Sequence, residues 1–329
     1  MKSTRLTFKN FKGPFITHGI DIIPDPAKPK TAVYIFAVNH PPSPEFLKCA
    51  SPSQCKVGTK ARSQIELFHH TLGSTTIQHV RTIRDKYITT PNDIYAQSPT
   101  SFFVTNDHFY REGILRETED LLPLAQWSNT IHVDISDLRA TNPEAGINAS
   151  IALTGIHNNN GLGHGQSDDE ILVTSAMGGR LYRGRMADSG NGKTKDAIRI
   201  VDSIEFGSAV DNPSYFDDPY RTETVDKSGY VLGGLSHVIR LGKTKQDPKG
   251  TDGVMVWFLE RSPLPADRRE KVPLPEPRVL FQDDGQRIRS ASVALLVPIK
   301  PKKGEQKREA WLFISGFVSL NMIAVKVEL

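Results

Sequence analysis

The sequence is poor in cysteine, in net charge and in long apolar runs. Its 2 cysteines, Cys49 and Cys55, are close enough to form a small disulfide loop and equally consistent with free thiols, so they do not define a redox compartment. The 41 basic and 37 acidic residues leave a net charge of +4, and the densest basic run lacks the interleaved aromatic residues of nucleic-acid-binding proteins. We therefore expect no nucleic-acid partner.

Neither end of the chain shows the pattern of a membrane or secretion signal. The first 15 residues are basic but contain no apolar segment of the kind found in secretory leaders. Residues 311–327 form the most apolar stretch, but serine, glycine and asparagine interrupt it. Its aromatic and β-branched residues predict two strands joined by a turn.

Helical patterns are also scarce. Most apolar segments are short, rich in Val, Ile, Phe and Tyr, and separated by Gly, Pro, Asn and Asp, which is typical of strands and turns. Residues 111–124 are the one convincing helix candidate. Many short strands without alternating helices predict an all-β fold, a propeller, a barrel or a sandwich, and we expect one domain over residues 1–329.

Asn92 and Asp93 offer an amide oxygen and a carboxylate side by side before a short apolar segment. In an extended backbone, successive side chains point to opposite faces, so the two residues could serve different ligands. Oxygen donors suit a hard cation such as calcium. The simpler interpretation is a turn, because Asn and Asp bend and cap the backbone.

Similar residues recur at other predicted strand ends. His18 precedes one strand and His40 follows the next, while Asn160 lies in a glycine-rich segment and Asp211 and Asn212 follow another strand. Taken singly, each is a common loop or turn residue. Their recurrence favours a shared site.

These segments, in this order, resemble the paraoxonase/arylesterase family, with the look of a fungal member. The resemblance rests on FITHGI, VYIFAVNHP, TIRDKYITTPNDIYA, FFVTNDHFY, NNNGLGHG, IEFGSAVDNP and FISGFVSLNMIAVKVEL. It covers nearly the whole chain, with insertions around residues 49–63, 140–158 and 300–309. The ordered set of motifs is more specific than any one of them.

The resemblance implies a six-bladed β-propeller that binds two calcium ions and hydrolyses lactones and aryl esters. Carried over by motif, the ligands of the catalytic calcium are Asn92, Asn160, Asp211 and Asn212. Those of the structural calcium are Asp93 and the backbone carbonyl of Ile20. The resemblance further implies that His18 activates water, that His40 is its proton-relay partner and that His108 lines the substrate pocket.

The chain departs from the family pattern at its start. The family has a long segment before the His-Gly-Ile motif, which supplies a Glu to the catalytic calcium and an Asp to the structural one. Only 17 residues precede His18 here, and none has a carboxylate side chain. We therefore expect the first blade, the ring-closing strand and any N-terminal membrane or signal segment to be missing, and calcium to bind more weakly. We favour a shortened form of a longer enzyme over a naturally short relative.

Two other functions remain open at this point. One is a non-catalytic calcium-stabilised propeller, or an inactive truncated form, that binds a partner. The other is a related hydrolase of another substrate class, such as a sugar-lactone lactonase. The family is mostly secreted or membrane-anchored, and the sequence itself assigns neither a compartment nor an oligomeric state.

Overall fold

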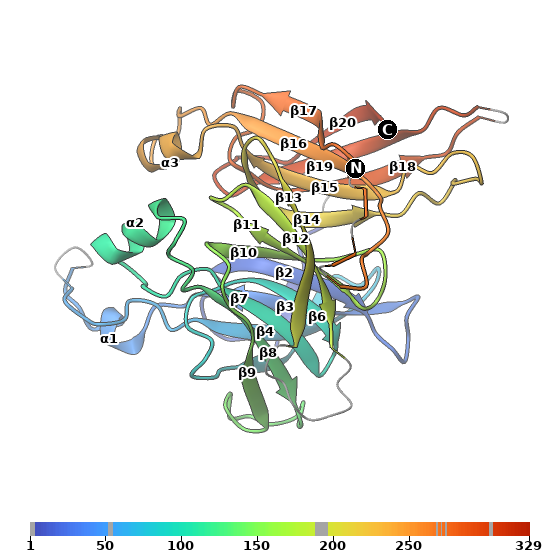
Figure 1. The fold of residues 1–329 in the computed structure, drawn as a ribbon. Coiled ribbons are helices and arrows are strands. Elements are labelled where there is room, and N and C mark those ends of the chain that lie inside the picture. Colours follow the sequence, from blue (N-terminus) through green and yellow to red (C-terminus); the bar gives the residue numbers. More distant parts are fainter. Residues whose placement is uncertain are drawn as a thin grey trace. The chain divides into compact units, whose positions relative to one another are not determined.

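The computed structural model describes residues 4–51, 55–187, 197–267, 269, 270, 272, 273, 275–302 and 305–329 (Figure 1). The chain divides into two compact units. The first contains Met1–Arg111 and Ser128–Thr154, and the second contains Glu112–Trp127, Gly155–Gly192 and Asp196–Leu329, as far as these ranges are described. Each unit has its own sheets and its own buried core.

The first unit contains two antiparallel meanders. One sheet has the order β1-β5-β4-β3-β2, in which β1 pairs parallel to β5, and the other has the order β6-β7-β8-β9. The elements are β1 (Thr7–Lys9), β2 (Thr17–Pro24), β3 (Ala32–Asn39), α1 (Pro44–Leu47), β4 (Gln64–Thr71), β5 (Thr76–Ile83), β6 (Pro91–Ser98), β7 (Ser101–Asn106), β8 (Asn129–Ile135) and β9 (Ile147–Leu153). The rings of buried Phe36 and Phe102 meet across the two sheets, with centroids 5.2 Å apart and planes tilted by 44°. They share one apolar core with Ile65, Ile94 and Ile131.

The second unit contains three further meanders. Its elements are α2 (Ile114–Leu121), β10 (Asn159–His164), β11 (Glu170–Ser175), β12 (Arg180–Met186), β13 (Ile198–Glu205), β14 (Ala209–Phe216), β15 (Gly229–Leu235), α3 (Val238–Thr244), β16 (Val254–Glu260), β17 (Arg278–Asp283), β18 (Ala291–Ile299), β19 (Glu309–Gly316) and β20 (Ile323–Glu328). The first sheet runs β10-β11-β12-β13. The second runs β17-β16-β15-β14-β18-β19-β20, and it joins two meanders through one parallel pair, Asn212 with Val293.

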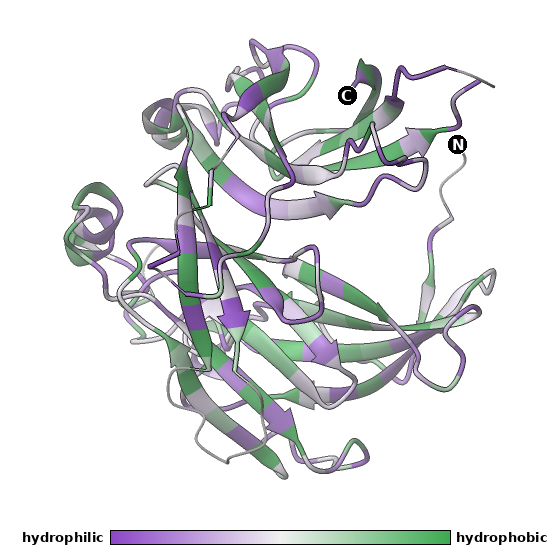
Figure 2. Cartoon of the chain, turned by 45° about the vertical axis from the view of Figure 1, so that its right-hand side comes forward, coloured by the Kyte–Doolittle hydropathy of each residue, from purple (hydrophilic) through white to green (hydrophobic). Residues whose placement is uncertain are grey.

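The predicted all-β fold is confirmed. The described residues form four meanders of four strands and one of three, and such meanders are the blades of β-propellers. Apolar and polar residues alternate along several of the strands, as expected where one face packs on a core (Figure 2). The number of blades in a complete ring and the single domain both stay predictions.

Two local predictions are also confirmed. The helix expected over residues 111–124 is α2, which is shorter because Gly113, with a positive φ, begins it and Leu122 ends it. The apolar stretch near the C-terminus forms β19 and β20, an antiparallel pair. Within the described part of the chain, no helix has the length and apolar character needed to span a membrane.

The first strand of each meander opens with a β-bulge. Between two successive residue pairs, β2, β6, β10 and β14 each move on by three residues while the neighbouring strand moves on by two. In β18 the corresponding steps are two residues and one. Each bulge therefore contains one extra residue, which bends the strand and redirects its side chains. The residue pairs inside the four longer bulges are His18–Gly19, Asn92–Asp93, Asn160–Gly161 and Asp211–Asn212.

The bulge of β2 lies directly against that of β6. A Cβ atom added to Gly19 would contact the carbonyl oxygen of Asn92 and would lie 2.6 Å from the Cα atom of Asp93. Farther along β2, the Asp21 carboxylate accepts a hydrogen bond of 2.7 Å from the backbone N–H of Ala96 on β6. Glycine is thus required at position 19 for the close approach of two backbones.

We expect Gly19→Ala to destabilise the first unit. The added methyl group has no room against backbone atoms, and overpacking of this kind costs about 1–3 kcal/mol. Urea unfolding should show a lower midpoint than for the wild type. Gly58→Ala is the matched control, because nothing lies within 4 Å of its added Cβ atom. Equal midpoints for the two variants would contradict the close approach.

Candidate active site

His18 and His40 form a ring contact in the first unit. His18 is the bulged residue of β2, and His40 directly follows β3. Their ring centroids lie 5.6 Å apart with an interplanar angle of 62°. The structure thus brings together the two histidines that the sequence places 22 residues apart.

A buried polar network holds the backbone on which His40 sits. The Asn39 side chain accepts a hydrogen bond from Ile16 N at 2.8 Å and donates one to the buried Glu66 carboxylate at 3.0 Å. Burial raises the pKa of Glu66, but hydrogen bonds from His79, Asn39, Thr82 and Gln64 outweigh it and hold that pKa below its usual value. His40 itself donates its backbone N–H to Ile16 O at 2.9 Å.

Both histidine rings favour the neutral form. Burial lowers the pKa of His40 to about 4, and electrostatic repulsion from the neighbouring His18 and Arg111 adds to it, although the Asp107 carboxylate opposes this shift. The pKa of His18 is lowered by desolvation of its ring, against the same carboxylate, although part of the residue's surface stays exposed. A neutral imidazole can accept a proton, which is what a general base requires.

Asp107 connects the other candidate residues of the first unit. Its carboxylate accepts a hydrogen bond from Asn92 Nδ2 at 3.1 Å and lies 3.0 Å from Nδ1 of the buried His108. Because Asn92 donates through its nitrogen, its Oδ1 atom is the one that can bind a cation. The neighbouring Asp93 is buried, and its backbone N–H donates to Thr105 Oγ1 at 3.0 Å.

Asp107 stands at a predicted strand end, but sequence reasoning gave it no role in the site. Its signal was present, because a carboxylate beside His108 at a strand end is a ready partner for an imidazole. Its contact with Asn92, 15 residues away, depends on the pairing of β6 with β7. Ile20 lies just past the bulge of β2, and its exposed side chain does not bear on the role predicted for its backbone carbonyl.

The second unit brings together Asn160, Asp211 and Asn212 within two adjacent bulges. A Cβ atom added to Gly161 would lie 2.8 Å from Asn212 Cα and 2.9 Å from Asn212 Oδ1. Asn160, Asp211 and Asn212 are all half-buried. The Gly161 N–H donates to Thr174 Oγ1 at 2.9 Å, which fixes the β10 bulge against β11.

The candidate donors are mostly amide oxygens. No group of three or more His, Cys, Asp and Glu side chains suited to a metal occurs among the residues that the structure describes. The predicted donors are Asn92 and Asp93 in the first unit, and Asn160, Asp211 and Asn212 in the second. Side-chain oxygens of Asn and Asp are ligands that calcium accepts, so the donor chemistry fits this ion.

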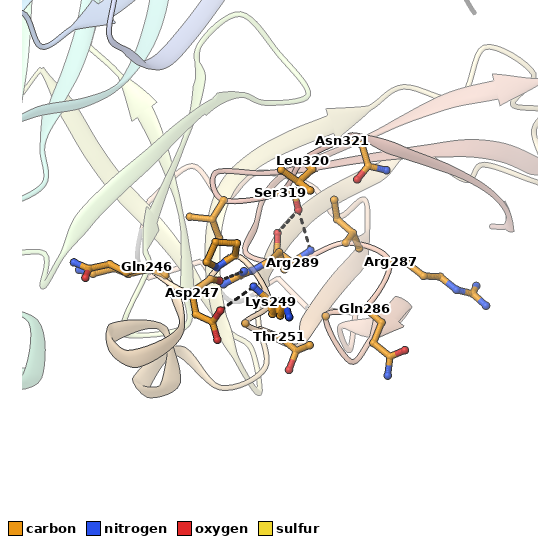
Figure 3. A pocket seen from close by; sticks show the side chains of 16 residues that line it. Gln246, Asp247, Lys249, Thr251, Gln286, Arg287, Arg289, Ser319, Leu320 and Asn321 are labelled. Atoms are coloured by element: carbon orange, nitrogen blue, oxygen red, sulfur yellow. Dashed lines mark hydrogen bonds between the residues drawn. The ribbon is translucent and has the colours of Figure 1, made fainter.

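A cavity of about 500 Å³ in the second unit contains none of these residues (Figure 3). Arg289 lines this cavity, and its guanidinium group makes structural contacts. It donates hydrogen bonds to the backbone oxygens of Asp247 and Thr244, both at 2.8 Å. It also forms an ion pair with the buried Asp252 at 2.7 Å. This cavity therefore lies outside the candidate site.

The family profile described as "Arylesterase" matches residues 54–219. The matched stretch is half of the chain and contains Asn92, Asp93, His108, Asn160, Asp211 and Asn212. The chain belongs to the arylesterase family. Its motif-based resemblance to the paraoxonase/arylesterases is thereby confirmed.

Curated members of the arylesterase family align with shorter stretches. Serum paraoxonase/arylesterase 2 of Gallus gallus is 33% identical over 127 residues, which are 39% of this chain and 30% of that protein. Serum paraoxonase/arylesterase 1 of Homo sapiens is 32% identical over 125 residues, which are 38% of this chain and 29% of that protein. The alignments thus cover less than a third of the length of these two relatives.

A solved structure described as an oxidoreductase (glucose dehydrogenase) of Thermus thermophilus is also similar. It superposes with a TM-score of 0.45 at 12% identity, covering 100% of this chain and 86% of that one. A likeness at this level leaves the function of the arylesterase-family chain open.

We expect His40 to stay neutral throughout the mildly acidic range. Its pKa is about 4 in the folded protein against 6.5 for an unperturbed histidine, so the unfolded chain takes up the proton first as the pH falls. The stability that neutral His40 contributes is therefore present above pH 6.5 and lost as the pH falls towards 4. Urea midpoints should fall more between pH 7 and pH 5 for the wild type than for His40→Gln. An equal fall in the two proteins would contradict the lowered pKa of His40.

Proposed function

We propose that the protein is a calcium-dependent hydrolase of lactones and aryl esters. The observation that carries this proposal is the recurrence of one bulge in successive meanders of an arylesterase-family chain. The paired positions of these bulges contain His18 and every predicted side-chain ligand of calcium. Bulges redirect side chains and are frequent beside active sites.

The residues of the chain divide the work between binding and proton transfer. Asn92, Asn160, Asp211 and Asn212 would hold the catalytic calcium, and Asp93 with the Ile20 carbonyl would hold the structural one. When bound, calcium supplies a positive charge that polarises an ester or lactone carbonyl and stabilises its oxyanion. These three amides and one carboxylate would leave a bound ion more residual positive charge than a set of carboxylates would.

The histidine pair supplies the base. Neutral His18 takes a proton from water as the water oxygen attacks the carbonyl carbon and the C=O π electrons move to the carbonyl oxygen. His40, in ring contact with His18, accepts the proton onward. When the C=O bond re-forms, the C–O bond to the alcohol breaks, and the histidine pair returns the proton to the departing alkoxide. Asp107 stabilises positive charge on both rings, since its carboxylate raises both pKa values. His108, buried beside Asp107, would line the pocket for a small-molecule ester or lactone.

We expect the chain to hydrolyse phenyl acetate or a member of a γ- and δ-lactone panel, and EDTA to abolish that hydrolysis. His18→Gln should lower kcat by about 100-fold or more, because the amide cannot act as a base at neutral pH. The matched control is His237→Gln at an exposed histidine with no assigned role, which should leave kcat within about twofold of the wild type.

Two results would decide against this function. Hydrolysis that His18→Gln leaves unchanged would remove the proposed base. Complete inactivity on the whole panel, with calcium bound, would instead favour the non-catalytic calcium-stabilised binding protein.

Calcium binding is testable without any substrate. We expect calcium to raise the melting temperature of EDTA-stripped protein, because an ion bound only by the folded state stabilises it by mass action. Asp211→Asn removes the one carboxylate of the catalytic set and should weaken calcium binding by about tenfold or more in isothermal titration. Asp217→Asn, at an exposed surface ion pair, is the control and should bind calcium like the wild type. Equal affinities for the two variants would remove Asp211 from the site.

A further inference from the structure

The ladder between β3 and β4 continues beyond the two strands. Asn39 pairs with Gln64, Arg62 N donates to Pro41 O at 2.8 Å, and Pro42 forms a bridge with Ala61. The two residue numbers sum to the same value in every one of these pairs, so the antiparallel register is unbroken. It places His40 and Ser63 directly opposite each other.

The two side chains meet as this register requires. Ser63 Oγ lies 2.8 Å from His40 Nδ1, within hydrogen-bond distance. Among the residues that the structure describes, His40 is the only hydrogen-bond partner of this hydroxyl. With Nδ1 held by Ser63, His40 Nε2 is the ring nitrogen left for proton exchange with His18.

A hydroxyl suits a histidine that relays protons. It can donate to a bare Nδ1 atom or accept from a protonated one, simply by rotating its O–H bond. A backbone carbonyl or a carboxylate in the same place would accept only, and would fix the proton on Nδ1. Ser63 thus holds the ring in one orientation while allowing both tautomers.

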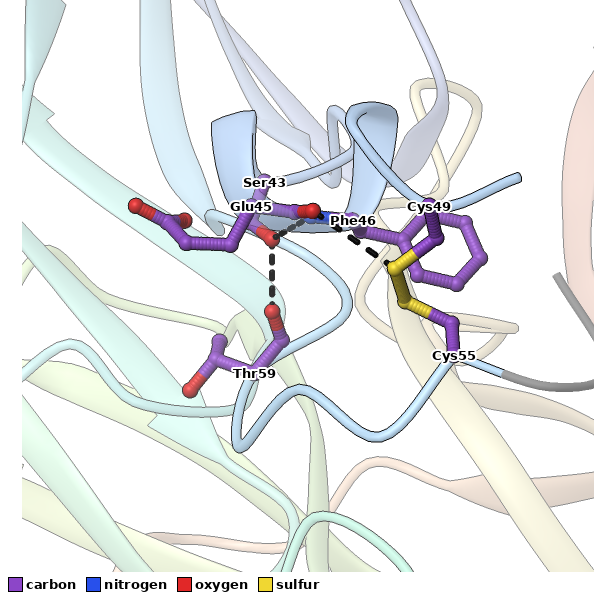
Figure 4. Close-up of a disulfide and its surroundings, with 6 residues drawn as sticks. All are labelled: Ser43, Glu45, Phe46, Cys49, Cys55 and Thr59. Carbon is purple, nitrogen blue, oxygen red and sulfur yellow. Dashed lines mark hydrogen bonds between the residues drawn. A yellow bond between two sulfur atoms is a disulfide. The ribbon is translucent and has the colours of Figure 1, made fainter. Parts of the chain in front are cut away.

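The chain segment between His40 and Ser63 is held together at two places, by hydrogen bonds near its base and by a disulfide farther from it (Figure 4). Ser43 Oγ accepts the backbone N–H of Phe46 at 3.1 Å to cap α1, and donates to Thr59 O across the ladder at 2.6 Å. Farther out, Cys49 and Cys55 form a disulfide with a Cα–Cα distance of 5.5 Å. These links hold residues 59–63 in register with residues 39–43.

We propose that Ser63 is a positioning residue that orients His40 and permits its change of tautomer. This rests on the proposed hydrolase function for its kinetic consequence, but the contact itself does not depend on activity. In this role Ser63 acts through His40, and it is not one of the predicted calcium ligands.

The kinetic test compares Ser63→Ala with Ser63→Thr. We expect Ser63→Ala to lower kcat by about tenfold with KM within about twofold, because a relay imidazole has lost its orientation. Ser63→Thr keeps the hydroxyl and should recover most of the rate. In a His40→Gln background, Ser63→Ala should have no further effect, since the two residues act as a unit.

A second measurement needs no substrate. The ¹⁵N resonances of the His40 ring, assigned by their absence in His40→Gln, report which nitrogen carries the proton and whether Nδ1 is hydrogen-bonded. Ser63→Ala should shift them, and Ser63→Thr should leave them near the wild-type positions. Melting curves establish that each variant is folded.

The outcomes separate this proposal from the hydrolase function. If the wild type is active and Ser63→Ala changes neither kcat nor the His40 resonances, the positioning role is wrong and the hydrolase stands. An additive loss of kcat in the His40→Gln background would likewise overturn it. If no substrate is hydrolysed but the resonances shift as expected, the positioning role stands and the hydrolase fails.

Discussion

The close approach of first strands within each unit is the constraint on which the candidate site depends. Gly19 lets the backbone of β2 reach that of β6, and Gly161 lets β10 reach β14. A side chain at either glycine would separate the strands and move the bulged residues beside them. The bulges and the glycines therefore act together. The bulge redirects the polar side chains, and the missing Cβ atom of the glycine allows the two strands, and with them these side chains, to lie close together.

The close placement of His18, His40 and Asp107 determines the electrostatics of the candidate site in the first unit. Loss of hydration is the main cause that lowers the pKa of both imidazoles, and the neighbouring His18 ring lowers that of His40 further. The nearby Asp107 carboxylate, which also contacts Asn92 and His108, raises the pKa of both rings, but the loss of hydration outweighs it. The result is a pair of neutral rings beside a carboxylate, and this arrangement can receive a proton and keep the resulting cation stable.

Local patterns in the sequence predicted the strands and the helix, whereas the roles of the individual site residues came from the family resemblance and stay predictions. Asn92 and Asp93 were found because Asn-Asp pairs at strand ends are conspicuous, and the ordered motifs indicated the family. The alternation expected of a regular strand does not describe this pair, because it lies in a bulge, and bulges arise from pairing with a neighbouring strand. Likewise, Asp107 and Ser63 gained roles only through strand register, which no local pattern specifies.

The segment between His40 and Ser63 shows how the β3–β4 register can be kept on both sides of a long insertion. Closing a longer loop costs little extra entropy, about 0.6 kcal/mol for each doubling of its length, so the ladder at its base can stay intact. A disulfide within the excursion reduces its freedom further in the unfolded chain. The insertion can therefore vary at its tip while its base keeps Ser63 opposite His40.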